Sequence, residues 1–263
     1  MSRQDEDLAL AHELADLADA ITLDRFLAHD LVVEAKPDLT PVSDADRAVE
    51  HTLRQALRSR RPRDAVLGEE EGESGSGPRR WVLDPIDGTK NFVRGVPVWA
   101  TLIALQDDGQ GSVGLVSAPA LGRRWWAANG TGAHTGGALT GARRLRVSGV
   151  GRLEDASVAY SSLTGWEEQG RLHGLLQLSR EVWRTRAYGD FWSHLLVAEG
   201  AVDAAFEPEV SLWDLAPLQV ILEEAGGRFT DLTGAARVDG GSALSTNGLL
   251  HELILQALQP GTG

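Results

Sequence analysis

Cysteine is absent from the 263 residues of this chain. A disulfide framework and a zinc site built on thiolates are therefore both excluded. Long apolar runs are absent as well, since none approaches the roughly 18 residues that indicate a membrane-spanning helix. The N-terminal segment alternates acidic and apolar side chains and lacks the basic-then-apolar pattern of a signal peptide. We therefore expect a cytoplasmic protein that has no membrane partner.

Positive charge is also scarce, because the formal net charge is −13 at pH 7. Proteins that bind nucleic acids normally present a basic face. Here the arginine pairs are scattered and form no long basic run, at Arg79/Arg80, Arg123/Arg124 and Arg143/Arg144. We therefore expect no nucleic-acid partner. A phosphorylated small molecule stays compatible with this acidity, because bound divalent metal ions reverse the sign of the local field.

Hydrophobic residues make up 42% of the chain and include eight tryptophans, which is enough for a sizeable core. Apolar residues recur at helical spacing over residues 8–23 and 45–57, whereas residues 99–128 contain short apolar runs separated by turn signals. Helices and strands alternate again in the second half. This order predicts an α/β or α+β protein with layered sheets and helices, in a single domain over residues 1–263.

The Gly-rich stretch from Gly130 to Gly141 is the weakest point of this pattern, and it predicts a boundary between two lobes near residue 145. Two further stretches are expected to be loops, namely residues 36–43 with their two prolines and the acidic, Gly- and Ser-rich residues 68–78. Residues 167–179 are expected to form one helix, and residues 181–187 one strand.

The stretch WVLDPIDGTKNF (residues 81–92) carries the strongest chemical signal. Its first three residues read as the end of a buried strand, and the following proline favours extended geometry at Asp84, which should finish that strand. Gly88 then permits a sharp turn. The pattern holds the like charges of Asp84 and Asp87 close together, which folding alone does not favour. A divalent cation would offset this repulsion.

Four other acidic residues are predicted at the ends of helices or strands, where side chains of separate elements converge: Asp46, Glu69, Glu207 and Asp214. Mg²⁺ prefers a few carboxylates, a backbone carbonyl and water, with substrate phosphate completing its octahedron. A purely structural interpretation also exists. Asp46 and Asp214 fit the Ser-x-x-acid pattern of a helix start, and Glu69 opens an acidic run of the kind usually found on solvated surfaces.

Taken together, several motifs resemble the inositol monophosphatase family over almost the whole chain. They are Gly68-Glu69-Glu70, the hexapeptide from Asp84 to Thr89, Trp213-Asp214 and Glu224-Ala225-Gly226-Gly227. The resemblance implies the layered α-β-α-β-α sandwich of the inositol monophosphatase and fructose bisphosphatase type. It further implies a phosphatase that depends on two or three Mg²⁺ ions and forms a homodimer.

By the same resemblance, the metal ligands would be Glu69, Asp84, the carbonyl of Ile86, Asp87 and Asp214. The implied catalytic residues are Glu69, Thr89 and Asp46. Asp46 would orient Thr89, which would position the attacking water beside Glu69, while the amides of Gly88 and Thr89 would contact the phosphate. Paired metal ions activate water and stabilise the attacking and leaving oxygens, so no covalent nucleophile is needed.

Within the family, the residues after the hexapeptide and the segment 186–203 most resemble the histidinol-phosphate phosphatase branch, which implies a role in histidine biosynthesis. Histidinol carries an ammonium group and an imidazole, and the carboxylates of Asp190 and Glu207 would bind them. Arg186 would brace the turn before Asp190. The structural alternative for Asp190 is an N-cap of the helix that follows it.

Other residues near these motifs have two interpretations each. Trp192 or His194 could flank the imidazole ring, although a helix histidine is more often satisfied by protein partners. Lys90 and Arg94 are either cations beside the phosphate or ordinary loop charges.

Two alternatives to a histidinol-phosphate phosphatase stay open at this point. The first is a member of the same family with another substrate, inositol monophosphate or a nucleotide 3′-phosphate. The second is a metal-binding regulatory protein that has lost catalysis. The presence of Glu69, Asp87 and Thr89 disfavours this second alternative, because a decayed site would have lost one of them.

Overall fold

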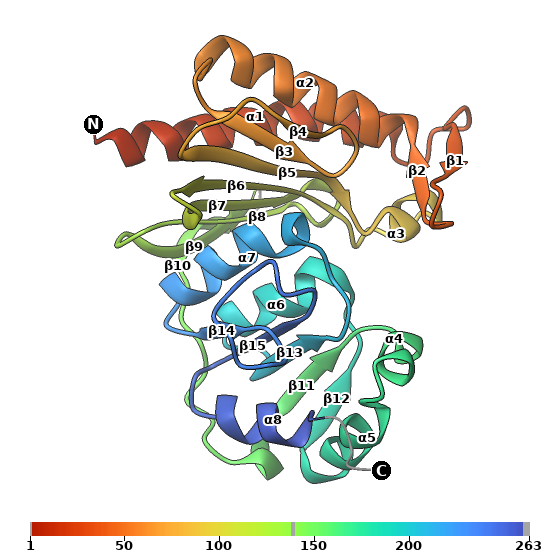
Figure 1. The fold of residues 1–263 in the computed structure, drawn as a ribbon, viewed down its shortest axis with the longest axis vertical. Helices are drawn as coiled ribbons and strands as arrows, with labels where there is room; N and C mark the ends of the chain where they lie inside the picture. The colour runs from red at the N-terminus through yellow and green to blue at the C-terminus, as the bar shows by residue number, and fades with distance from the viewer. Residues whose placement is uncertain (1, 138–139, 260–263) are drawn as a thin grey trace.

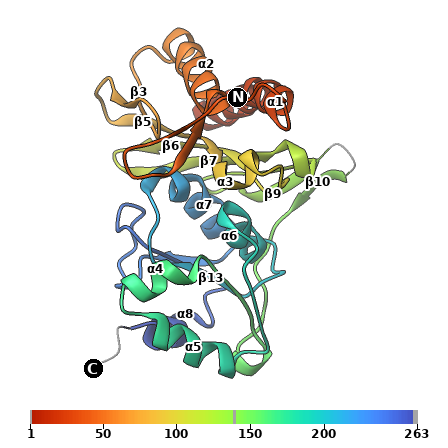
Figure 2. The same cartoon turned by 90° about the vertical axis from the view of Figure 1, so that its right-hand side faces the viewer.

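A computed structural model describes residues 2–137 and 140–259. Three helical layers and two sheets alternate in it, in the order α-β-α-β-α (Figure 1). Helices α1 (Arg3–Arg25) and α2 (Asp44–Arg60) cover the outer face of an eight-stranded sheet. Helices α6 (Asp190–Ala198) and α7 (Leu212–Glu224) lie between this sheet and a five-stranded sheet (Figure 2). The far face of the second sheet carries α4 (Leu163–Glu168), α5 (Leu172–Glu181) and α8 (His251–Ala257).

This layering confirms the predicted fold class. The eight-stranded sheet has the order β10-β9-β8-β7-β6-β5-β3-β4, and within it only β3 and β5 run parallel as neighbours. Its strands are β3 (Ala65–Gly68), β4 (Gly72–Ser74), β5 (Arg79–Asp87), β6 (Ala100–Asp107), β7 (Gln110–Ala118), β8 (Arg123–Ala128), β9 (Gly132–Gly137) and β10 (Thr140–Arg144). The short helix α3 (Thr89–Val93) follows β5 directly.

The five-stranded sheet has the order β12-β11-β13-β15-β14, with β11 parallel to both of its neighbours. Its strands are β11 (Ser157–Tyr160), β12 (Arg184–Arg186), β13 (Ala204–Glu207), β14 (Arg228–Thr230) and β15 (Ala243–Thr246). A separate hairpin pairs β1 (Val33–Ala35) with β2 (Pro41–Ser43). Within the described ranges, no helix combines the length and the apolar character needed to cross a bilayer.

Amphipathic helices hold the layers together. The predicted apolar face of α2 is fully buried: Val49, Leu53 and Leu57 pack against α1 and the eight-stranded sheet, whereas Ala45 packs with Ile86, Phe92 and Trp99. On the opposite face of the same sheet, α7 lies unusually close to β7. A Cβ atom on Gly114 would come within 2.5 Å of the Pro217 carbonyl oxygen, so only glycine permits this approach. Helix α7 begins after the N-cap Ser211, and its first turn carries Asp214.

Several local expectations were wrong. Residues 36–43 are not simply a loop, because Pro41–Ser43 pairs with Val33–Ala35, and the acidic stretch 68–78 contains strand β4. Residues 167–179 do not form one helix, since the chain turns at Gly170, which has φ = 66°. In 181–187 only Arg184–Arg186 forms a strand. Short hairpins account for the first two departures and a local turn for the third, whereas Arg184–Arg186 pairs with the distant strand Ser157–Tyr160.

The Gly-rich stretch 130–141 also departs from expectation, because β9 and the start of β10 run through it and extend the eight-stranded sheet. Residues 138 and 139 of this stretch lie outside the described residues. The last strand of the eight-stranded sheet ends at Arg144, and the five-stranded sheet begins at Ser157.

Candidate metal centre and substrate cavity

A break in the register of β5 places Asp84 and Asp87 on one side of the sheet. Residues three apart in a regular strand point to opposite faces. Here Asp84 pairs with Leu102 and Asp87 with Ala100, so the stretch between the two aspartates holds one residue more than its partner strand. Such a bulge reorients the side chains that follow it. Asp84 therefore does not finish the strand as expected, because β5 continues through Pro85 to Asp87.

Glu69 reaches the same place from the neighbouring strand. It follows β3 directly, and its amide donates to the Leu83 carbonyl at 3.2 Å, next to Asp84. Because β3 and β5 are parallel, their carboxyl ends meet at one edge of the sheet. The Glu69 carboxylate accepts a hydrogen bond from the Lys36 ammonium at 2.7 Å.

Asp214 completes the group from the N-terminus of α7. Its Oδ2 accepts the Ser211 amide at 2.8 Å, so it does cap the helix. One oxygen atom from each of Asp84, Asp87 and Asp214 lies within 4.8 Å of the others. The structural and the functional interpretation of Asp214 are thus compatible, because a carboxylate has two oxygens and the cap uses one.

The electrostatics of this cluster favour a cation. Burial, followed by the charges of Glu69, Asp87 and Asp214, raises the pKa of Asp84 well above its ordinary range. Burial and the neighbouring charges of Asp190 and Asp214 raise the pKa of Asp87 in the same way. Burial also raises the pKa of Asp214 to about 7, against the opposing hydrogen bond from Ser211. Removing water from carboxylates this close together is costly unless a positive charge joins them.

The donor set suits a hard divalent ion, because it consists of carboxylate oxygens and one carbonyl. The Ile86 carbonyl oxygen accepts the Thr89 hydroxyl at 2.9 Å, and a carbonyl has a second lone pair for a further partner. The residues present therefore fit Mg²⁺.

Thr89 and Asp46 lie beside this cluster. The Thr89 hydroxyl lies within hydrogen-bonding distance of two acceptors, Asp46 Oδ1 at 3.3 Å and the Ile86 carbonyl at 2.9 Å. The other oxygen of Asp46 accepts the amide of Ser43 at 2.7 Å and its hydroxyl at 2.6 Å, which completes the capping box of α2. Asp46 is fully buried, and burial raises its pKa. Asp46 therefore both caps a helix and contacts Thr89.

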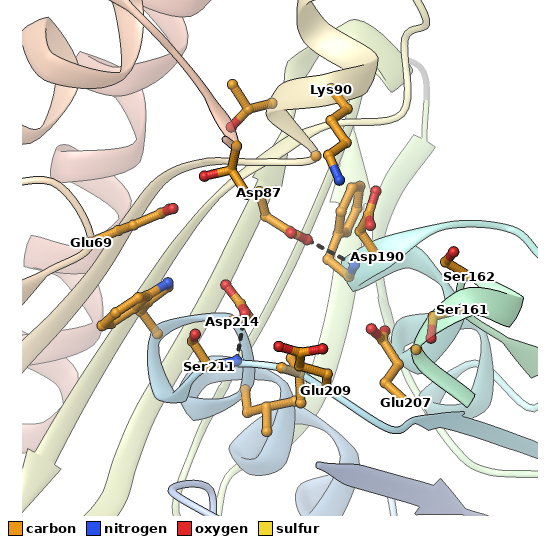
Figure 3. Close-up of a pocket in the computed structure, with 18 of the residues that line it drawn as sticks. Glu69, Asp87, Lys90, Ser161, Ser162, Asp190, Glu207, Glu209, Ser211 and Asp214 are labelled. Carbon is orange, nitrogen blue, oxygen red and sulfur yellow. Dashed lines mark hydrogen bonds between the residues drawn. The ribbon is translucent and has the colours of Figure 1, made fainter. Parts of the chain in front are cut away.

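A cavity of about 970 Å³ opens in front of these residues. Figure 3 shows Glu69, Asp87 and Asp214 pointing into one space from three sides, with Asp190 and Glu207 across from Glu69. Gly88, at φ = 83°, lines the cavity where the two sides meet. A Cβ on Gly88 would come within 3.2 Å of Asp190 Oδ2 and 2.9 Å of the Val98 carbonyl, so glycine is required here.

Asp190 does not cap helix α6, so that interpretation is wrong. The N-cap is Gly189, which makes no side-chain capping bond, and Asp190 is the first helical residue, at the unusual φ of 42°. Its Oδ2 instead accepts from the Asn91 amide at 3.3 Å. Burial and the charge of Glu207 raise the pKa of Asp190 to about 6. The first amide of α6 that faces the metal cluster, that of Phe191, donates to Asp87 at 2.8 Å.

Glu207 lies at the end of β13 and lines the same side of the cavity as Asp190. Its Oε1 is 3.1 Å from Nε2 of His194, whose other ring nitrogen is 2.7 Å from the Ser245 hydroxyl. The His194 side chain is 1% exposed. It is therefore satisfied by protein partners, although it also reaches the cavity wall.

The structure does not bring every candidate to the cavity. Arg186 is exposed on β12 and donates to the Thr185 carbonyl, so it neither lines the cavity nor contacts the turn before Asp190. Arg94 is exposed outside the lining, and Trp192 packs edge-on against Tyr188. Lys90, by contrast, does line the cavity.

Sequence reasoning missed Lys36, which lies between the strands of the hairpin β1–β2 and bonds both Glu69 and Glu70 at 2.7 Å. The composition of the chain nevertheless contained a signal for Lys36. Of the 25 lysines and arginines only two are lysines, Lys36 and Lys90, and both line this cavity. Other lining residues were missed without any evident signal, among them Ser161, Ser162 and Glu209.

The layered fold and the crowded carboxylate cluster at the cavity define a class of protein built around a divalent-metal site. The inositol monophosphatase family model matches residues 3–262 of the chain. A histidinol-phosphatase of Streptomyces coelicolor is 63% identical, over 95% of this chain and 96% of that protein. A histidinol-phosphatase of Mycobacterium tuberculosis is 59% identical, over 97% of this chain and 99% of that protein.

Solved structures agree with this assignment. The extragenic suppressor protein suhB from Bartonella henselae superimposes with a TM-score of 0.88 at 29% identity, over 97% of this chain and 99% of that one. The chain belongs to the inositol monophosphatase family. The family predicted from the motifs is thereby confirmed.

Proposed function

We propose that this protein is a Mg²⁺-dependent phosphoric monoester hydrolase that acts on histidinol phosphate in histidine biosynthesis. The observation that carries the proposal is the distribution of charge around the cavity. Glu69, Asp87 and Asp214 meet on one side, where the Lys36 ammonium bonds Glu69, and the Lys90 ammonium lies nearer Asp190, whose pKa its charge lowers. A second set of acids stands across from Glu69, and its members are Asp190, Glu207 and Glu209.

This division suits a substrate with an anionic and a cationic end. A phosphate would lie between metal ions, the lysines and the backbone amides at the start of α3. The cationic part of the alcohol would then meet Asp190 and Glu207, because ionised carboxylates form strong, charge-assisted hydrogen bonds with ammonium and imidazolium groups. A neutral polyol would gain much less from these acids. The names and the identities of the two relatives support the same substrate.

For the metal ions, we propose that Glu69, Asp84 and the Ile86 carbonyl hold one Mg²⁺ and that Asp84, Asp87 and Asp214 hold another. A third ion is compatible with the family resemblance. When bound, such ions activate water as a nucleophile near neutral pH and neutralise charge on the leaving oxygen. The crowding of Asp84, Asp87 and Asp214 within 4.8 Å is the structural reason for a shared cation.

The protein's own groups would position the other reactants. Asp46 is held by Ser43 and accepts from Thr89, so it orients the threonine hydroxyl toward a water beside Glu69. The amides of Gly88 and Thr89 lie at a helix start, where they lack intrahelical partners and can contact a phosphate oxygen. Arg186 is left out of this proposal because it lies away from the cavity.

Three broader expectations stay predictions: a single domain over residues 1–263 with two lobes that divide near residue 145, a homodimer, and a cytoplasmic location.

A phosphate-release panel in the presence of Mg²⁺ tests the proposal. The esters are histidinol phosphate, inositol 1-phosphate, glycerol phosphate and a nucleoside 3′-phosphate, each measured as kcat/KM on the same preparation. We expect the largest value for histidinol phosphate. A preference for a neutral polyol phosphate would show that the proposed substrate is wrong, while the proposed hydrolysis of a phosphate monoester would stand. No release from any ester, with Mg²⁺ binding shown by calorimetry, would instead support a regulatory protein.

A further inference from the structure

A hydrogen-bonded chain of three side chains connects the substrate side of the cavity to the interior of the five-stranded sheet. His194 lies on α6, Glu207 ends β13 and Ser245 lies on β15. Strands β13 and β15 are antiparallel neighbours, so Glu207 and Ser245 come from adjacent strands. His194 is 1% exposed and Ser245 is fully buried. Only Glu207 of the three side chains reaches appreciably toward solvent, at 13%.

The chemistry of the three groups sets the direction of the chain. A neutral imidazole has one nitrogen that donates and one that accepts, whereas an ionised carboxylate only accepts. Nε2 of His194, 3.1 Å from Glu207 Oε1, must therefore carry the proton. Nδ1 is then the acceptor, and the Ser245 hydroxyl donates to it at 2.7 Å. Glu207 thus selects the tautomer in which His194 donates to it, and Ser245 supplies the donor that Nδ1 of this tautomer accepts.

This arrangement immobilises one oxygen of Glu207 and leaves the other available. In the described part of the chain, Oε2 of Glu207 receives no hydrogen bond, while the residue lines the cavity. A free glutamate side chain samples many rotamers, and a ligand must restrict them at an entropic cost. Holding Oε1 from within the protein removes this cost before the substrate arrives. Binding sites depend on such support behind the contacting residues.

We propose that His194 is a positioning residue for substrate specificity: it orients Glu207 so that its free oxygen meets the cationic part of the phosphate ester. This inference rests on the proposed function, because it assumes a cationic substrate. His194 does not contact the substrate itself, since both ring nitrogens are engaged by protein groups. It acts through Glu207, and Ser245 acts through His194.

Substrate selectivity separates this role from a structural one. The measure of selectivity is the ratio of kcat/KM for histidinol phosphate to kcat/KM for glycerol phosphate. His194→Met keeps an apolar group of similar length but donates nothing to Glu207, and we expect the ratio to fall about tenfold, mainly through KM for histidinol phosphate. His194→Gln offers an amide N–H to Glu207, so it should retain most of the wild-type ratio.

A second buried histidine provides a matched control. His251 lies at the start of α8, is fully buried and bridges the hydroxyls of Thr230 and Thr246 at 3.0 and 2.9 Å. His251→Met should lower the melting temperature but leave the selectivity ratio unchanged. In a Glu207→Gln background, His194→Met should have no further effect on the ratio, because residues that act through one another are not additive.

Each outcome decides a specific claim. If His194→Met does not fold, the ratio is measured in Ser245→Ala instead. We expect it to fall there too, by a smaller factor. The inference about His194 is wrong if kcat/KM falls equally for both esters, or if the ratio is unchanged in both His194→Met and Ser245→Ala. Either result leaves the proposed function standing. A wild-type enzyme that shows no preference for histidinol phosphate overturns the proposed function and this inference with it.

Discussion

The two sides of the cavity carry the same kind of side chain at different degrees of crowding. On the metal side, Asp84, Asp87 and Asp214 crowd within 4.8 Å, and all three have raised pKa values. On the substrate side, Asp190 and Glu207 each have a protein donor, from Asn91 and His194 respectively. The metal-side acids also have backbone donors, from Phe191 to Asp87 and from Ser211 to Asp214, so the two sides differ in the crowding of their carboxylates.

This difference bears on the function of each side. Crowded, desolvated carboxylates cannot all be ionised without a counter-charge, so the first side is built to bind metal. Asp190 and Glu207 are less crowded and are each oriented by a side-chain donor, which suits recognition of a small cation. Experiments that remove the metal or individual acids should therefore affect the two sides in different ways.

The largest effect should come from removing divalent ions. In excess chelator we expect phosphate release to fall to background and to return on addition of Mg²⁺, because the crowded carboxylates of Asp84, Asp87 and Asp214 need a shared cation. The melting temperature should rise with Mg²⁺ as well, since a ligand that binds only the folded state stabilises it. Full activity in excess chelator would contradict the metal mechanism.

The next largest effect should follow Glu69→Gln. Loss of a group that positions or deprotonates the attacking water lowers kcat by roughly 10²–10⁴-fold. KM for histidinol phosphate should change little. Steady-state kinetics with saturating Mg²⁺ measure both constants.

Glu70→Gln is the matched control for Glu69. Glu70 bonds the same Lys36 ammonium at the same 2.7 Å, but it does not line the cavity. We expect its kcat to stay near that of the wild type. A Glu69→Gln variant that changes KM alone would place Glu69 in substrate binding and outside the chemistry.

A smaller and selective effect is expected for Asp190→Asn. A hydrogen bond to a charged group contributes about 1.5–3 kcal/mol, so kcat/KM for histidinol phosphate should drop roughly ten- to a hundredfold. Asparagine also tolerates the positive φ at this position. Glycerol phosphate lacks the cation and should be hydrolysed almost as before. Equal losses on the two esters would indicate that the substitution had disturbed the metal side.

The smallest effect concerns the stability of the metal-free protein. Asp214 has a pKa of about 7 in the fold against an ordinary value of 3.8. Between these values the folded protein binds more protons than the unfolded chain, so the free energy of unfolding should decrease as the pH rises from about 4 to about 7. Asp84 and Asp87 act in the same direction. Mg²⁺ should reverse the loss.

Thermal melts of the wild type and of Asp214→Asn in chelator, across this pH range, isolate the contribution of Asp214. The variant should show a shallower decline, because it has no carboxyl at this position to ionise. His251 opposes the trend in both proteins equally, since burial lowers its pKa to about 4. A steeper decline in the variant would refute the assignment.

The metal side was largely predictable because its signals are local. Asp84, Asp87 and Thr89 lie in one hexapeptide, and the capping patterns of Asp46 and Asp214 are visible within four residues. Even there, the bulge that turns both aspartates to one side depends on pairing with β6. The substrate side was less predictable. The sequence pointed to Asp190 but left open that it only caps helix α6. The structure excluded this interpretation, because Gly189 is the N-cap and Asp190 accepts from Asn91.

The sequence by itself determined the amphipathic helices, the alternation of elements that makes the layered fold, and the residues of the hexapeptide motif. These features follow from spacing, capping and turn preferences that act over a few residues. The tertiary structure alone decided that Lys36 joins Glu69, that Arg186 lies away from the cavity, and that Glu207 is held by His194. His194 and Ser245 are 51 positions apart, and no local preference relates them. Such contacts arise only when separate elements pack, because the burial that brings them together is a property of the whole fold.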